Sequence, residues 1–373
     1  MDKRNDRKNN NMMKIPLYQP SLQGNEKKYV NECLDSTWIS SKGEYVERFE
    51  DAFAQYTNVR HAAAVTNGTA ALHVALLALD IGPGDEVIVP TLTYIASVNA
   101  ITYTGATPVF VDSRPETWQM DPADVARKIS PKTRAIVAVH LYGHPCDMEA
   151  LNDIVRRHRL QLIEDCAEAF GSRYNGTHVG AFGNVAAYSF YGNKTITTGE
   201  GGMVVTNDEA IHRKIVHLKG QGLAAHREYW HDVIGYNYRM TNICAAIGLA
   251  QLEQADTLLH KKRAIAEYYR EHLQGLPVTF HGEIGDVYHS YWMCSVLTKT
   301  PQVRNELRNC LANQGIETRP LFCPVHTMPM YQAKSQRYRV AEDLSGRGIN
   351  LPSWPDLQEE QLCAVVDAIK SYY

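Results

Sequence analysis

Short apolar runs rich in β-branched residues alternate with stretches of helical composition through the middle of this chain. The runs cover residues 86–90 (EVIVP), 107–111 (TPVFV), 134–140 (RAIVAVH) and 160–164 (LQLIE), and the helical stretches between them cover residues 93–103, 122–129 and 148–158. Strands and helices that alternate at this spacing form βαβ units, whose strands run parallel in a sheet covered on both faces. The sequence therefore predicts an α/β fold with a mainly parallel mixed sheet flanked by helices.

The pattern changes near residue 259. Two further strands are predicted at residues 185–190 and 203–206, helices at 243–259 and 261–273, a strand at 291–298 and helices at 302–314 and 357–371. We therefore expect three parts: a disordered polar tail over residues 1–13, a large domain over 14–258 and a small C-terminal α/β domain over 259–373.

Composition excludes several classes of protein. The 373 residues include 38 Lys and Arg against 41 Asp and Glu, so no polybasic field favours nucleic acid or an anionic membrane. No apolar run reaches the roughly 18 residues of a membrane helix, and residues 1–11 lack the apolar core of a secretory signal. Met12 or Met13 is an alternative start. The eight cysteines form no C-x-x-C pair, which favours a reduced cytoplasm over zinc or disulfides.

A turn of small residues, TNGTAA at 66–71, follows an apolar stretch and precedes a helical run. Backbone N–H groups and the positive end of a helix dipole make such a turn a phosphate cradle, to which the Thr66 and Thr69 hydroxyls add donors. An ordinary N-capped helix would show the same residues. The chain lacks the G-K-[ST] of a Walker loop and the G-x-G-x-x-G fingerprint here, which argues against ATP and NAD.

An acidic cluster follows the apolar run that ends near residue 164. Asp165 comes at the carboxyl end of this predicted strand, where α/β sheets bind ligands, with Glu164 and Glu168 on either side. A turn-forming or capping aspartate would look the same in sequence. Asp165 is our first candidate for a functional carboxylate and Glu164 is the next.

Lys194 lies in a loop of uncharged residues, YGNKTITTG, and is the only Lys or Arg between Arg173 and Arg213. Partial desolvation disfavours the ammonium form, lowers the pKa and frees the amine as a nucleophile. A phosphate cradle, a strand-end carboxylate and such a lysine together match the needs of pyridoxal phosphate: its phosphate, its ring nitrogen and its aldehyde.

These motifs, in this order, resemble the nucleotide-sugar aminotransferases of the DegT/DnrJ/EryC1/StrS family. The resemblance extends from residues 15–17 (IPL) to Pro352 and includes WISSKG at 38–43, PTLTY at 90–94, GYNYRM at 235–240 and LPS at 351–353. It implies a fold of type I among pyridoxal phosphate enzymes, similar to aspartate aminotransferase, and a homodimer with shared active sites.

The resemblance also implies roles for single residues. Lys194 matches the lysine that binds the cofactor aldehyde, and Asp165 matches the carboxylate that keeps the pyridine nitrogen protonated. Glu168 stands near the cofactor hydroxyl, where many members carry Gln or His. The remaining cofactor residues that the resemblance implies are Gly68, Thr69 and Ser189 at the phosphate, Tyr94 against the ring, and Asn237 at the phosphate of the neighbouring subunit.

Within the family, three stretches resemble the members that aminate C4 of GDP-4-keto-6-deoxy-D-mannose with L-glutamate. They are SFYGNKTITTGEGG, GYNYRMTNICAAIGLAQLEQAD and IETRPLFCPVHTMPMY. This resemblance implies a cytoplasmic enzyme of O-antigen and lipopolysaccharide synthesis, with pyridoxamine phosphate as the intermediate cofactor form. The residues expected at the sugar nucleotide are Trp38, Lys42, Arg319, His326 and Tyr331.

Three alternatives remain from the sequence. The keto sugar could carry dTDP or UDP in place of GDP. A sugar dehydratase on the same fold would use the same cofactor, but the dehydratases of the family carry His at the position of Lys194. A non-enzymatic sensor or binding protein would have no need of the lysine, which argues against it.

Overall fold

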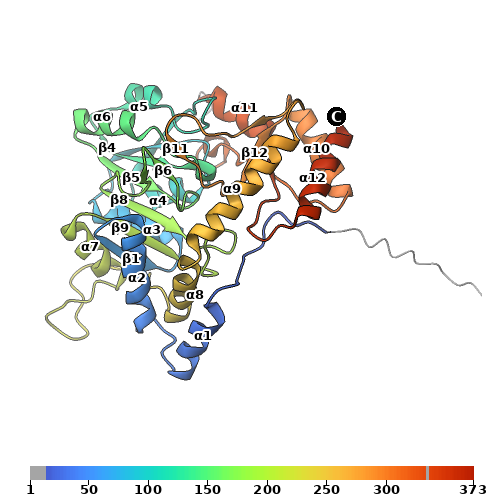
Figure 1. Ribbon diagram of the computed structural model, residues 1–373. Helices are drawn as coiled ribbons and strands as arrows, with labels where there is room; N and C mark the ends of the chain where they lie inside the picture. The colour runs from blue at the N-terminus through green and yellow to red at the C-terminus, as the bar shows by residue number, and fades with distance from the viewer. Residues whose placement is uncertain (1–13, 333–335) are drawn as a thin grey trace, which may run out of the picture.

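Figure 1 shows the computed structural model, which describes residues 14–332 and 336–373. Its centre is a seven-stranded sheet in the order β1-β9-β8-β5-β4-β2-β3. The strands are β1 (His61–Val65), β2 (Glu86–Pro90), β3 (Thr107–Val111), β4 (Thr133–Val139), β5 (Gln161–Asp165), β8 (Val185–Ser189) and β9 (Gly202–Thr206). β3, β2, β4, β5 and β8 pair in parallel, and β9 runs antiparallel between β8 and β1. The predicted mainly parallel mixed sheet is confirmed.

Helices cover both faces of this sheet, as Figure 1 shows. Side chains alternate along each strand, so that Val87 and Val89 face one core and Ile88 faces another. On the first face lie α3 (Gly68–Ala78), α4 (Ala96–Tyr103) and α7 (Glu209–Lys219). On the second lie α2 (Glu44–Thr57), α5 (Pro122–Lys128), α6 (Met148–His158) and α8 (Asn242–Leu252), with α1 (Glu26–Asp35) packed on α8.

A second, antiparallel sheet forms the C-terminal part. Its strands, in order, are β10 (Thr279–Phe280), β12 (Cys294–Leu297), β14 (Gly348–Leu351) and β13 (Arg319–Pro320). It shares a core with α9 (Ala255–His272), α10 (Pro301–Asn313) and α12 (Glu359–Tyr372). α11 (Arg339–Arg347), the short helices η1 (Leu141–Gly143) and η2 (Val325–Thr327), and a small sheet of β6 (Arg173–Tyr174), β7 (Thr177–His178) and β11 (Val287–Tyr288) complete the fold.

The expected domain boundary falls inside a helix. α9 begins in the same core as α8, through Leu258 and Leu259, and continues into the core of the C-terminal part through Ile265 and Tyr269. The first described residues also join that part, since Ile15 pairs with Ile316. The division at residues 258/259 therefore stays a prediction, and the predicted tail over residues 1–13 lies outside the described residues.

Across the described residues, 14–332 and 336–373, every helix is too short or too polar to cross a bilayer.

β5 ends on two carboxylates with different surroundings. Glu164 is fully buried and accepts hydrogen bonds from the N–H groups of Gly180, Phe182 and Gly183 at 2.7–2.8 Å. His140 Nε2 donates the fourth at 3.1 Å, because its Nδ1 accepts from the N–H of Cys146. Glu164 therefore fixes the loop before β8. Asp165 instead accepts from Ser97 and Ala167.

We predict opposite effects on stability for the two isosteric amides. In Glu164→Gln, an amide NH₂ must face an N–H donor whichever way it turns, which should lower the free energy of unfolding by about 2–4 kcal/mol. Asp165→Asn should leave it unchanged or slightly higher, because burial raises the pKa of Asp165 and so disfavours its charge. Urea unfolding of the two cofactor-free variants at pH 7 measures the difference; equal destabilisation would contradict this account of β5.

Candidate functional site

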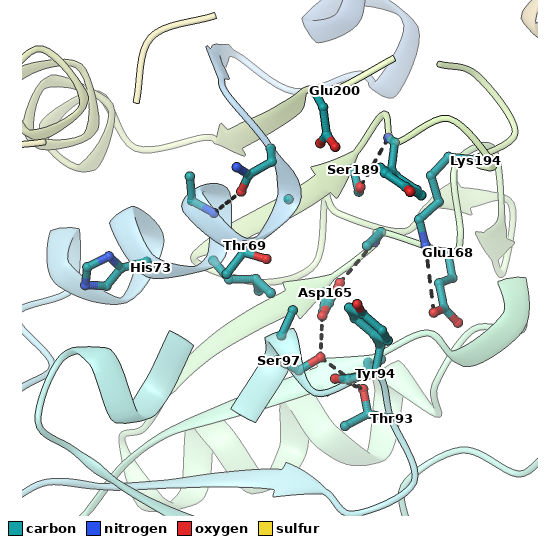
Figure 2. A pocket seen from close by; sticks show the side chains of 18 of the residues that line it. Thr69, His73, Thr93, Tyr94, Ser97, Asp165, Glu168, Ser189, Lys194 and Glu200 are labelled. Carbon is teal, nitrogen blue, oxygen red and sulfur yellow. Dashed lines mark hydrogen bonds and ion pairs between the residues drawn. The ribbon is translucent and has the colours of Figure 1, made fainter. Parts of the chain in front are cut away.

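A cavity of about 560 Å³ lies at the carboxyl ends of β5 and β8. The structure brings to its wall seven of the residues predicted from sequence: Gly68, Thr69, Tyr94, Asp165, Glu168, Ser189 and Lys194. Figure 2 shows Asp165 near the centre of this group, with Thr69 on one side and Lys194 on the other. Segments far apart in the chain therefore build one site at the sheet edge where parallel α/β proteins bind ligands.

The beginning of α3 forms one wall of the cavity. Asn67 caps this helix, and its Oδ1 accepts from the N–H of Ala70 at 2.8 Å. A Cβ added to Gly68 would lie 2.7 Å from Cβ of Ser189, so only glycine lets the helix end lie this close to β8. The free N–H groups of this first turn, with the hydroxyls of Thr69 and Ser189, make a wall suited to a phosphate.

Asp165 is held rigidly at the bottom of the cavity. Its Oδ2 accepts from Ser97 Oγ at 2.7 Å and its Oδ1 from the N–H of Ala167 at 3.0 Å. The Ser97 hydroxyl is itself 2.9 Å from Thr93 Oγ1. Burial raises the pKa of Asp165, and these hydrogen bonds and Lys194 oppose the rise. A positive charge placed against this carboxylate would hold it ionised.

The Lys194 amine lies in a largely buried corner of the cavity. Its Nζ is 3.9 Å from Oε1 of Glu168 and 3.8 Å from the ring centroid of Trp292. Oε2 of Glu168 accepts from the N–H of Tyr142 at 2.8 Å. Burial lowers the pKa of Lys194 and raises the pKa of Glu168, because it penalises both charged forms. The lowered pKa of Lys194 favours the neutral amine more than in an ordinary lysine side chain, in the direction that nucleophilic attack requires.

Sequence analysis missed three residues that shape this site. Ser97 and Thr93 orient Asp165, and their four-residue spacing at the start of α4 is the one sequence signal that could have indicated them. Trp292 also lines the cavity, but it comes from the C-terminal part and no local pattern links it to Lys194.

Asn237 and two predicted substrate residues lie outside the cavity wall. Asn237 is exposed after α7, where its Oδ1 accepts from Arg239 at 3.2 Å. Trp38 is 56% exposed and Lys42 is exposed, both before α2. Their assigned roles stay predictions.

The other three predicted substrate residues belong to the C-terminal part and also lie outside the cavity wall. Arg319 is exposed and pairs with Glu317 at 2.7 Å. His326 is buried, with its two ring nitrogens 2.7 Å from Thr91 Oγ1 and 3.2 Å from Glu342 Oε1. The Tyr331 hydroxyl donates to Asn99 on α4. These roles likewise stay predictions.

Comparison with known proteins connects this geometry to characterised relatives. The chain is 63% identical over 362 residues to GDP-perosamine synthase of Escherichia coli O157:H7, an alignment that covers 97% of this chain and 99% of the relative. It is 53% identical over 363 residues to GDP-perosamine synthase of Vibrio cholerae, covering 96% of this chain and 99% of that one.

A solved structure agrees with the fold over nearly the same length. The putative sugar aminotransferase Spr1654 of Streptococcus pneumoniae, solved in its PLP and PMP forms, superposes with a TM-score of 0.92 at 28% identity. The superposition covers 96% of this chain and 98% of that one. The family model described as the DegT/DnrJ/EryC1/StrS aminotransferase family matches residues 20–370. The chain therefore belongs to the DegT/DnrJ/EryC1/StrS aminotransferase family.

Proposed function

We propose that this pyridoxal phosphate-dependent aminotransferase transfers the amino group of L-glutamate to C4 of GDP-4-keto-6-deoxy-D-mannose. The products are GDP-perosamine and 2-oxoglutarate. The observation that carries the proposal is the buried Lys194 amine, which shares one cavity with Asp165 and the start of α3. The names of the 63% and 53% identical relatives support the choice of sugar nucleotide.

The residues of the cavity fit pyridoxal phosphate. Gly68 lets the start of α3 lie against Ser189, so the free N–H groups of this helix and the Ser189 hydroxyl share one wall of the cavity, as a phosphate requires. Asp165, fixed by Ser97 and Ala167, is the buried carboxylate that a protonated ring nitrogen requires. Lys194 supplies the amine for the aldehyde. When bound, the cofactor supplies that aldehyde and a ring that accepts an electron pair.

Each side chain in the cavity then has its own proposed role in the reaction. Lys194 Nζ takes the proton from Cα of the amino donor and returns it on the same side of the cofactor, so one lysine serves both halves of the reaction. The carboxylate of Asp165 holds the ring nitrogen protonated. Tyr94, which is 57% exposed on the cavity wall, would hold the ring face. Glu168 lies beside the amine and would face the cofactor hydroxyl.

The presence of Lys194 separates this proposal from two rivals. A dehydratase of the family would carry His at this position, and a sensor or binding protein would gain nothing from a buried reactive amine. For the nucleotide, we retain Trp38, Lys42, Arg319, His326 and Tyr331 as the proposed contacts. Lys42 and Arg319 are exposed cations that could reach a pyrophosphate.

We infer a homodimer with shared active sites. The segment after α7, residues 220–237, projects from the body of the protein beside α7 in Figure 1. It exposes Leu223, Tyr229 and Ile234, which are 50%, 93% and 87% accessible, an apolar surface of the kind that a second copy covers. Asn237 ends this segment at its base, paired with Gly220, and we propose that docking of the segment on a second copy brings Asn237 to the phosphate in the partner.

We also propose a cytoplasmic role in O-antigen and lipopolysaccharide synthesis. All eight cysteines are free thiols, which agrees with a reducing compartment.

A substrate panel tests the nucleotide. With L-glutamate as donor, kcat/KM for the GDP-linked 4-keto-6-deoxy sugar should exceed that for dTDP- and UDP-linked sugars by about two decades or more. The reason is that a site whose polar groups form hydrogen bonds with guanine leaves those groups unpaired when thymine or uracil binds. Release of 2-oxoglutarate measures turnover, and Lys194→Ala is the inactive control. A preference for dTDP or UDP would overturn the GDP assignment, and a sugar product without the amino group would indicate dehydration.

Hybrid dimers test the shared site. Lys194→Ala and Asn237→Asp chains, co-expressed with different tags, should give a purified hybrid with roughly half of wild-type activity, because one of its two sites carries neither lesion. The matched control pairs wild type with the Lys194→Ala/Asn237→Asp double variant, which leaves no intact site and should be inactive. The reverse pattern, with an inactive mixed hybrid and a half-active control, would show that each chain uses its own Asn237.

A further inference from the structure

Lys262 is a fully buried lysine that the proposed chemistry does not use. It lies in the middle of α9, where this helix passes into the C-terminal part. Its Nζ donates to the carbonyl of Trp292 at 2.9 Å, to the hydroxyl of Ser353 at 3.1 Å and to the carbonyl of Ser353. The three ammonium hydrogens are thus all satisfied, and none of these acceptors is charged.

A charge in this position is costly. A buried ammonium without a carboxylate loses its hydration and gains only dipoles in return, and burial lowers the pKa of Lys262 to about 8. Among residues 14–332 and 336–373, no carboxylate lies within ion-pair distance of it. A methionine would fill a similar volume without the desolvation cost of the ammonium. We therefore infer that the fold needs the three N–H donors of Lys262 Nζ.

The acceptors belong to segments that meet at Lys262. Trp292 precedes β12 and Ser353 follows β14, so neither carbonyl is paired within a strand. The N–H of Ser353 donates to the carbonyl of Leu17 at 3.2 Å, which attaches the N-terminal segment as well. One ammonium therefore connects the segments that carry Trp292, Ser353 and, through Leu17, Tyr18.

Two of these segments hold the loop around Lys194. The Tyr18 hydroxyl donates to the carbonyl of Lys194 at 2.6 Å, and the indole N–H of Trp292 donates to the carbonyl of Asn193 at 2.7 Å. The Trp292 ring also lies 3.8 Å from Lys194 Nζ. Two main-chain contacts of the loop, at the carbonyls of Asn193 and Lys194, are therefore made by side chains whose segments meet at Lys262.

We propose that Lys262 is a positioning residue for Lys194, which fixes Trp292 against the reactive amine and Tyr18 against the Lys194 carbonyl, and so keeps water from the amine. The proposal rests on the proposed role of Lys194. Loss of the Lys262 ammonium leaves the carbonyls of Trp292 and Ser353 unpaired, so Trp292 shifts and water reaches Lys194. Because water solvates the ammonium form, the pKa of Lys194 then rises toward its ordinary value.

The test measures the titration of Lys194 in the cofactor-free protein. Competitive labelling with acetic anhydride across pH, read by mass spectrometry of the Lys194 peptide, gives the midpoint of its titration. Lys262→Met should raise this midpoint by about half a pH unit or more. The matched control is Lys261→Met, the next residue of α9, which is exposed and pairs with Asp356 at 2.8 Å and should cause no shift.

Trp292→Phe tests the same connection by removing the contact between Trp292 and the loop around Lys194. This variant loses the indole donor to Asn193 but retains the Lys262 charge, so it should shift the midpoint upward as Lys262→Met does. The double variant should shift it no further than either single variant. An unchanged midpoint in either single variant, or additive shifts, would overturn the proposal.

Two further arms keep the outcome interpretable. If Lys262→Met does not fold, Lys262→Gln, which is neutral but retains one donor group, should show the same upward shift of the midpoint. If Lys262→Gln does not fold either, the result for Trp292→Phe alone decides the test. Failure of the proposed function would be seen separately, as wild-type protein whose Lys194 does not react with added pyridoxal phosphate.

Discussion

The parallel pairing of β5 with β8 is the constraint on which the site depends. Parallel strands end at the same sheet edge, so β5 brings Asp165 and β8 brings Ser189 to one cavity. The loop after β8 then returns Lys194 over the same space. α3 begins at this edge too, and Gly68 lets it lie against Ser189. One topological feature thus places a carboxylate, an amine and an anion-binding helix end within a single cavity.

Burial then sets the chemical character of these groups. The same desolvation that lowers the pKa of Lys194 raises the pKa of Glu168 beside it, and the attraction between their charges opposes both shifts. Asp165 is also buried, but two hydrogen bonds stabilise its charge. The C-terminal part completes this environment by placing Trp292 over the amine. The reactivity of Lys194 therefore depends on contacts between the two parts of the chain.

Sequence alone could predict the features that have a local pattern. The alternation of strands and helices predicts the sheet, and the uncharged loop around Lys194 predicts a desolvated amine, which its 12% side-chain exposure confirms. The helix predicted over residues 243–259 is wrong in its boundary, because α8 ends at Leu252 and α9 begins at Ala255. Leu249 and Leu258 pack in the same core, so the apolar periodicity continues across the break.

Other features have no local pattern to detect. Adjacent strand residues point to opposite sides, but sequence does not show which side holds the cavity, and so Glu164 remained an alternative to Asp165. In the structure Asp165 lines the cavity, whereas Glu164 accepts hydrogen bonds from the loop before β8. The contacts of Trp292 with Asn193 and of Tyr18 with Lys194 join segments 99 and 176 residues apart, which only tertiary packing brings together.

The central claim is that the buried amine in this cavity, and no other lysine, is the nucleophile. Borohydride reduction of the purified protein saturated with pyridoxal phosphate, followed by peptide mass spectrometry, tests it most directly. The account predicts one covalently modified peptide, which contains Lys194, and no comparable label on the other buried lysines, Lys219 and Lys262. Labelling of either of those lysines in place of Lys194, or no labelled peptide at all, would contradict it.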